Sequence, residues 1–123
     1  MPVFLGVVPA LRMFDPPKTL EFYVDFLGFK IDWEHRFSSD LPLYLQISMK
    51  DIVLHLSEHY GDATPGAKVF IHMKGIAKFQ AALSAKKYRF AKPGLVGEPY
   101  GATTMTVYDP ASNRLVFSES DES

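Results

Sequence analysis

The chain has 123 residues, which suits one compact domain with a core of its own. Its 47% hydrophobic and 22% charged residues are those of an ordinary globular protein, and a net charge of −1 provides no basic field for nucleic acid. There is no cysteine for disulfides or thiolate ligands, and residues 1–15 have neither a membrane-length apolar run nor the basic start of a secretion signal, so we expect a cytoplasmic protein.

The first half of the chain predicts a strand, a helix and three further strands. Residues 4–13 are rich in Val and Leu, and Pro9 interrupts this strand because proline cannot donate to a ladder. Asp15 is suited to cap a helix that ends at Gly28 and has the apolar stripe Leu20, Tyr23, Val24 and Leu27. Strands are predicted from residue 29 to 33 or slightly beyond, at 43–49 and at 52–57, the last two joined by a hairpin turn at 50–51.

The second half repeats this order. Residues 67–73 predict a strand, 76–85 a helix with the stripe Ile76, Phe79, Ala82 and Leu83, and 88–91 a short strand. After a loop at 92–101, strands at 103–108 and 114–118 form a hairpin across residues 109–113. Equivalent elements lie roughly 60 residues apart. We therefore predict an α+β domain over residues 1–123, with βαβββ modules at about 1–60 and 66–120 and a linker at 59–66.

Several short strings share the order and spacing of a known family. They are Glu21-Phe22-Tyr23, Leu27-Gly28-Phe29, Tyr100-Gly101, Asp109-Pro110 and Asn113. Together they resemble the glyoxalase/bleomycin resistance (vicinal oxygen chelate) superfamily over nearly the whole chain. Pro9, a proline in the first strand, resembles a feature of the bleomycin resistance branch. The resemblance implies a cup-shaped mixed sheet closing around a site. It also implies a homodimer that shares its first strand.

Four positions decide whether the cup can hold a metal. Enzymatic members of the superfamily place His or Glu on strands one, four, five and eight, and the matching residues here are Val8, His55, Lys68 and Val116. A divalent ion needs three or four N or O donors; valine offers none, and a charged lysine has no free lone pair. We therefore expect neither a metal nor another cofactor.

The string from His55 to His59 matches the H-x-x-E-H motif of inverted zinc peptidases. That chemistry needs a helix, whereas this run alternates like a strand, in which four residues advance about 13 Å. An atypical metal site of His55, Glu58 and His72 stays open. Three enzymatic functions also stay open as alternatives: a glyoxalase-like lyase, a dioxygenase-type metalloenzyme and a thiol transferase similar to fosfomycin resistance proteins. No G-x-S-x-G elbow or glycine-rich phosphate loop is present, so nothing in the sequence specifies bond breaking.

Period-2 alternation sorts the strand residues into two faces. If the four positions above face the cup, alternation places further residues on the same face: Val53, Ser57, Phe70, His72, Thr104, Thr106 and Tyr108. Met105 and Val107 then belong to the helix-side core. By resemblance, Trp33 and Tyr100, and more approximately Phe37, match aromatics that stack on flat rings of the drug in bleomycin resistance proteins. The predicted ligand-binding residues are Trp33, Arg36, Phe37, Tyr44, His55, Ser57, Lys68, Phe70, His72, Tyr100, Thr104 and Tyr108.

Some of these residues have an alternative structural interpretation. Trp33 suits core or dimer packing, His55 suits a satisfied interior histidine, and Arg36 suits a solvated charge. From residues and resemblance together we expect a metal-free homodimer that sequesters bleomycin-type glycopeptides, with no catalytic residues and no nucleic-acid or membrane partner. A metabolite-binding protein with another physiological ligand is a further alternative.

Overall fold

The computed structural model describes residues 1–36 and 38–121. Its elements confirm an α+β fold of two βαβββ modules. The first module contains β1 (Ala10–Arg12), α1 (Pro16–Leu20), which continues as a π-helix η1 (Glu21–Leu27), β2 (Lys30–His35), β3 (Tyr44–Met49) and β4 (Ile52–Ser57). The second contains β5 (Lys68–His72), α2 (Ile76–Ala85), β6 (Val96–Glu98), β7 (Ala102–Tyr108) and β8 (Arg114–Ser120).

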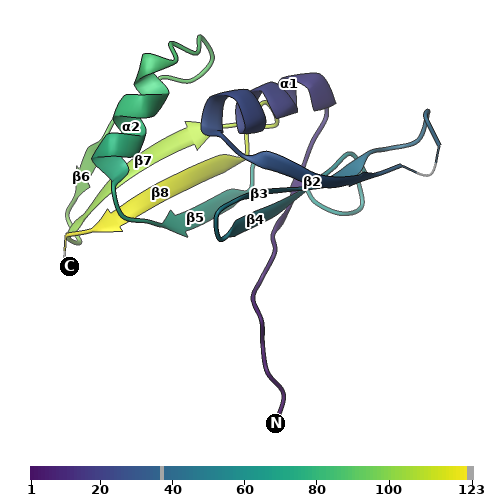
Figure 1. Cartoon of the computed structure of the whole chain (residues 1–123), viewed down its shortest axis with the longest axis horizontal. Coiled ribbons are helices and arrows are strands. Elements are labelled where there is room, and N and C mark those ends of the chain that lie inside the picture. The colour runs from purple at the N-terminus through teal and green to yellow at the C-terminus, as the bar shows by residue number, and fades with distance from the viewer. Residues whose placement is uncertain (37, 122–123) are drawn as a thin grey trace.

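Each module forms its own four-stranded mixed sheet. The strand orders are β1-β4-β3-β2 and β5-β8-β7-β6, so the duplication extends to the topology. In each sheet the first strand runs parallel to the last strand of its module, and the other pairs are antiparallel. Both helices lie on the same side of the sheets, and the N-terminal segment runs away on the other side (Figure 1). We call the first side the helix face and the second the open face.

The core lies on the helix face. Leu54 and Leu56 of β4 and Leu45 and Ile47 of β3 are buried in the first module. The second module contributes Ile71, Leu115 and Phe117, together with Met105 and Val107, which confirms the predicted sidedness of β7. Within the described residues, no helix is long and apolar enough to cross a lipid bilayer.

The first helix begins and ends where the sequence predicts. The Asp15 carboxylate accepts a hydrogen bond from the Lys18 amide at 3.1 Å, and Gly28 ends the helix with a φ of 100°, a conformation that favours glycine. The predicted apolar stripe is only partly correct. Tyr23 and Leu27 are buried and Leu20 packs partly buried against the core, but Phe22 and Phe26 are buried in place of Val24. The reason is that residues 21–27 form a π-helix, whose wider turn shifts the buried face.

Two predicted strands need correction. The strand expected at residues 4–13 is limited to Ala10–Arg12: the Pro9 carbonyl accepts from the His55 amide at 2.9 Å, and residues 1–8 leave the sheet. The strand expected at 88–91 is a turn: the Ala91 amide donates to the Tyr88 carbonyl at 3.4 Å, and the Tyr88 ring stacks on Phe26 with centroids 4.8 Å apart. The sixth strand is instead Val96–Glu98, which pairs with β7.

A buried polar network joins the two modules. The Tyr23 hydroxyl donates to Asp109 Oδ2 at 2.7 Å, and Asn113 Nδ2 donates to the same oxygen and to the Arg12 carbonyl, each at 2.9 Å. Asn113 Oδ1 in turn accepts from the Ala67 amide at 3.1 Å. Burial, and then the neighbouring Asp109 carboxylate, raise the pKa of Tyr23 well above its usual 10.0. The phenol therefore stays a hydrogen-bond donor across the ordinary pH range.

Replacing Tyr23 by Phe should lower the free energy of unfolding by about 1–3 kcal/mol, because one buried donor to the Asp109 carboxylate is lost. Urea unfolding measures this difference. Tyr60→Phe is the matched control, since Tyr60 is exposed, and should stay within about 0.5 kcal/mol of the native chain. Equal stability of both variants would contradict the role given to this bond.

Candidate ligand-binding site

The open face of the first sheet follows from the pairing of β3 with β4. Tyr44, Gln46 and Ser48 alternate with buried residues of the helix face and therefore point the other way. Across the ladder, Gln46 lies opposite His55. The pairing gathers these polar and aromatic side chains on one surface.

Three rings form what we call the aromatic cluster: Trp33, Tyr44 and His55. The Trp33 and Tyr44 rings stack with centroids 6.1 Å apart and planes 10° from parallel. His55 meets Trp33 edge-on at 5.4 Å and Tyr44 edge-on at 5.1 Å. Trp33 keeps 43% of its surface exposed, so this stack is a platform at the surface rather than part of the core.

A chain of hydrogen bonds holds the rings of the aromatic cluster in place. Tyr44 Oη lies 2.7 Å from His55 Nδ1, and His55 Nε2 lies 3.0 Å from Gln46 Oε1. The Gln46 amide nitrogen donates to Asp32 at 3.1 Å, so its oxygen faces the histidine and can only accept. The proton of neutral His55 therefore sits on Nε2, and Nδ1 accepts from the Tyr44 hydroxyl. Both ring nitrogens are occupied, which leaves His55 oriented but not free to bind an ion.

The environment also sets the charge of this chain of bonds. Hydrogen bonds from Gln46 and from Ser48, the latter at 2.9 Å, lower the pKa of Asp32 below its usual 3.8. Burial, and then the charge of Asp62, raise the pKa of Tyr44. At neutral pH the chain of hydrogen bonds therefore has the ionised carboxylate of Asp32 at one end and the neutral phenol of Tyr44 at the other.

The sequence missed the polar residues that support the cluster: Asp32, Gln46 and Ser48. Gln46 and Ser48 could have been found, since strand alternation places them on the face of Tyr44. Asp32 could not, because alternation assigns it and Trp33 to opposite faces. The register of β2 against β3 shifts between Ile31 and Trp33, and this bulge lets Asp32 bond Gln46 while Trp33 stacks on Tyr44.

The second sheet also presents predicted site residues on its open face. Phe70 and Tyr108 are exposed, and the His72 ring contacts Phe70 edge-on at 5.1 Å. Lys68 is exposed beside Arg114, its neighbour across the ladder. Thr104 is buried, and its hydroxyl donates to Glu98 at 2.6 Å. This face is thus aromatic and basic, without the polar network of the first sheet.

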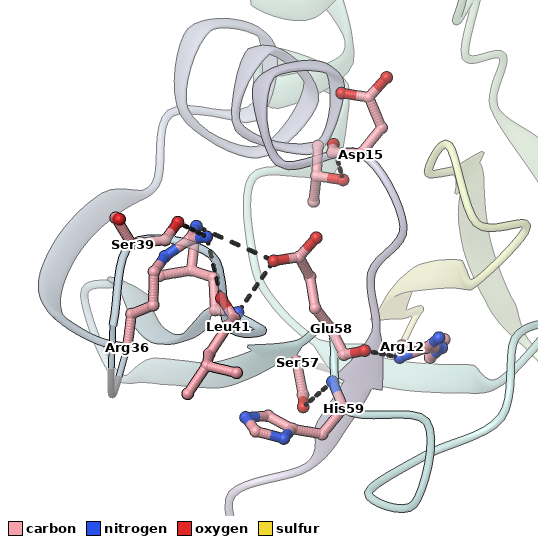
Figure 2. A network of polar contacts seen from close by, with 10 residues as sticks. Arg12, Asp15, Arg36, Ser39, Leu41, Ser57, Glu58 and His59 are labelled. Atoms are coloured by element: carbon pink, nitrogen blue, oxygen red, sulfur yellow. Dashed lines mark hydrogen bonds and ion pairs between the residues drawn. The ribbon is translucent and has the colours of Figure 1, made fainter.

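Arg36 and Ser57 belong to a network around Glu58 (Figure 2), and Ser57 lies opposite Tyr44 in the ladder between β3 and β4. Arg36 Nη1 donates to the carbonyls of Ser39 and Leu41 at 3.3 and 3.0 Å, and so holds the turn before β3. Ser57 is 0% exposed and donates to Asp62 at 2.6 Å. Both side chains are occupied by the fold itself, and their predicted role in binding remains a prediction.

Two predicted aromatics remain, Tyr100 and Phe37. Tyr100 is exposed in the turn between β6 and β7. Phe37 lies outside the described residues. Within the described residues, Tyr100 does not join the stack of Trp33 on Tyr44.

The register shows that the four positions that match the metal ligands of enzymatic members are equivalent between the two modules. Ala10 pairs with His55 and Phe70 pairs with Val116, and Val8 and Lys68 each stand two residues earlier. The residues do not fit a divalent ion: two valines lack donors, Lys68 is a cation, and His55 Nδ1 already accepts from Tyr44.

Other metal arrangements fit no better. His55 lies on β4, a strand, so the H-x-x-E-H string lacks the helical spacing of a zinc peptidase. The Glu58 carboxylate accepts from the Leu43 amide at 2.8 Å. Among residues 1–36 and 38–121, no three His, Cys, Asp or Glu side chains are grouped so that they could hold a metal ion.

Comparisons with known proteins point in one direction. A sequence profile described as "Glyoxalase superfamily protein" matches residues 2–123. A bleomycin-binding protein from bleomycin-producing Streptomyces verticillus, solved with copper(II)-bleomycin, is 28% identical to the chain. The match covers 95% of this chain and 97% of that one, with a TM-score of 0.71. The two therefore share one fold.

Two further solved structures are similar in fold. An antibiotic binding protein from a Streptomyces strain is 14% identical over 98% of each chain, with a TM-score of 0.71. A bleomycin-binding protein complexed with bleomycin is 18% identical over 94% of this chain and 98% of that one, with a TM-score of 0.68. No curated protein matches the chain in sequence.

The carboxyl of Asp32 should titrate below 3.8, and Gln46→Leu should raise its pKa more than Lys30→Gln does. The hydrogen bond from Gln46 is the larger cause of the shift, and the charge of Lys30, 3.9 Å away, is the smallest. Because the folded-state pKa is lowered, the stability that Asp32 contributes is present above its usual pKa and is lost as pH falls through the folded value. Carbon-detected NMR titration measures both variants. A larger effect of Lys30→Gln would contradict the assignment.

Proposed function

The chain belongs to the glyoxalase superfamily, as its motifs predicted, and on this premise we propose that it binds a flat aromatic small molecule on the open face without using a metal. In its finer form, the proposal is that the ligand is a bleomycin-type glycopeptide and that binding sequesters the drug. The supporting comparison is the 28% identity, over 95% of the chain, to a bleomycin-binding protein solved with copper(II)-bleomycin.

One observation carries the proposal: the exposed indole of Trp33 stacked on Tyr44. A flat heteroaromatic ring can extend such a stack, and an aromatic pair contributes about 0.5–1.5 kcal/mol beyond the area that it buries. The hydrogen bonds of His55 and Gln46 hold Tyr44 in place before a ligand arrives. Less side-chain freedom is then lost on binding, which favours affinity.

The second sheet supports the same kind of ligand. Phe70 and Tyr108 supply exposed aromatic surface, and Tyr100 adds more in the neighbouring turn. Lys68 supplies a charge that can meet polar or anionic groups of the ligand. Binding by stacking and burial requires no metal ion as an electrophile. The donor set at Val8, His55, Lys68 and Val116 therefore favours binding over the metalloenzyme alternative.

We further propose that the binding unit is a homodimer in which residues 1–8 of each chain pack on the other. Phe4 and Leu5 are 92% and 95% exposed, and Val3 and Val7 are exposed as well. A contiguous apolar segment in water is a feature of interaction surfaces. The segment leaves the sheet at Pro9, so it is placed to reach a second copy and to cover part of an open face.

Trp33→Ala should weaken bleomycin binding by about 1–3 kcal/mol, because a stacking surface and its buried area are lost. Calorimetry with the metal-free drug measures the effect. Phe90→Ala is the matched control: Phe90 is also exposed but contacts Lys18 and Arg89 rather than the cluster, so binding should be unchanged. If Trp33→Ala melts like the native chain and binds equally well, the ligand lies elsewhere.

Phe4→Glu combined with Leu5→Glu should convert the dimer into a monomer, since charges would be buried where the partner chain covers the segment. Light scattering should give twice 13.8 kDa for the native chain and 13.8 kDa for the variant. Tyr60→Glu, at another exposed aromatic outside the segment, should leave the dimer intact. A native chain that is monomeric at micromolar concentration would contradict the dimer.

A further inference from the structure

The two modules meet at two equivalent places, which we call seams. At each seam a helix of one module faces the connection between two strands of the other module. Strands β3 and β4 occupy the places in their sheet that β7 and β8 occupy in the other, so the β3–β4 turn corresponds to the β7–β8 loop. At the first seam, helix η1 meets the β7–β8 loop through the Tyr23–Asp109 hydrogen bond. At the second, helix α2 faces the β3–β4 turn.

The two connections at the seams differ in length. The β7–β8 connection has five residues, 109–113, and places the buried Asp109 and Asn113 between the modules. The β3–β4 connection has only Lys50 and Asp51, and both are exposed. A groove of about 710 Å³ remains between this turn and α2, which we call the seam groove. Its volume lies in the range of small-molecule sites.

The seam groove has an apolar floor and a basic rim. The floor consists of helix-face side chains from both modules: Met49, Ile52, Met73, Phe79, Ala82 and Phe117. The rim carries Lys50, Lys74 and Lys78, with His72 at one edge and Asp51 as the single acidic residue of the lining. None of the three lysines forms an ion pair with a carboxylate of residues 1–36 or 38–121.

We propose that the seam groove is a second binding site, which takes a small amphipathic anion: an apolar chain or ring ending in an acidic group. Three lysines around an apolar floor complement such a ligand in both charge and polarity. Most of the apolar lining belongs to the core of the helix face, so the groove opens on the side of the sheets opposite to the aromatic cluster. The exposed segment of a second copy fits it poorly, because residues 1–8 contain no acidic side chain to meet the lysines.

The site is tested with decanoate as the anionic probe and decyltrimethylammonium as a cation with the same chain, both below their micelle concentrations. Amide NMR spectra of the full chain should shift with decanoate at Lys50, Lys74, Gly75 and Phe79, and should remain unchanged at Trp33 and His55. Octanoate, shorter by two methylenes, should bind about tenfold more weakly, because the floor is apolar.

Lys74→Glu combined with Lys78→Glu should weaken decanoate binding at least tenfold. Lys87→Glu combined with Lys92→Glu changes the net charge equally, at exposed lysines beyond the other end of α2, and should leave binding within about twofold. The same spectra verify that both variants are folded.

Three results would overturn the proposal. One is equal affinity for the cation and the anion, and another is equal weakening in the two double variants. The third is a set of decanoate shifts confined to the aromatic cluster or to the C-terminal end of α2, which would place the anion outside the seam groove.

Discussion

The rest of the structure depends on the buried carboxylate of Asp109. Its two oxygens accept four hydrogen bonds: from the Tyr23 hydroxyl of the first module, from the side chain of Asn113, and from the backbone amides of Ala111 and Asn113. Asn113 extends the connection to Arg12. A buried charge is stable only when it is saturated in this way, so the modules are held in one relative position.

That position determines which surfaces are available for binding. With both helices on one side, the opposite faces of the two sheets stay open and can carry Trp33, Tyr44 and Phe70 at the surface. The same geometry places two chemically different surfaces on opposite sides of the sheets. The open face has an exposed aromatic stack supported by His55 and Gln46, whereas the seam groove has an apolar floor beneath lysines.

The sequence predicted local structure well where a residue acts on its own backbone. Asp15 and Gly28 bound the first helix, and residues 76–85 and 52–57 form the predicted helix and strand. It failed where a distant contact decides: Tyr88 stacks on Phe26 instead of joining a strand, and Val96 becomes a strand only by pairing with Thr104. At the site, the sequence predicted both Tyr44 and His55 as binding residues, but the bulge that places Asp32 beside Gln46 leaves no sequence signal. Among the strings that carried the family resemblance, Tyr23, Asp109 and Asn113 belong to the hydrogen-bond network that joins the two modules.

Trp33 is the only tryptophan of the chain, so its fluorescence reports directly on the proposed platform. Titration with metal-free bleomycin in the presence of a chelator should change the Trp33 emission saturably, with one ligand per chain and an affinity equal to the calorimetric value. This result would place a flat ring on the indole and show that no metal is needed. Calorimetric binding without any change in emission, or binding that disappears with the chelator, would contradict the account.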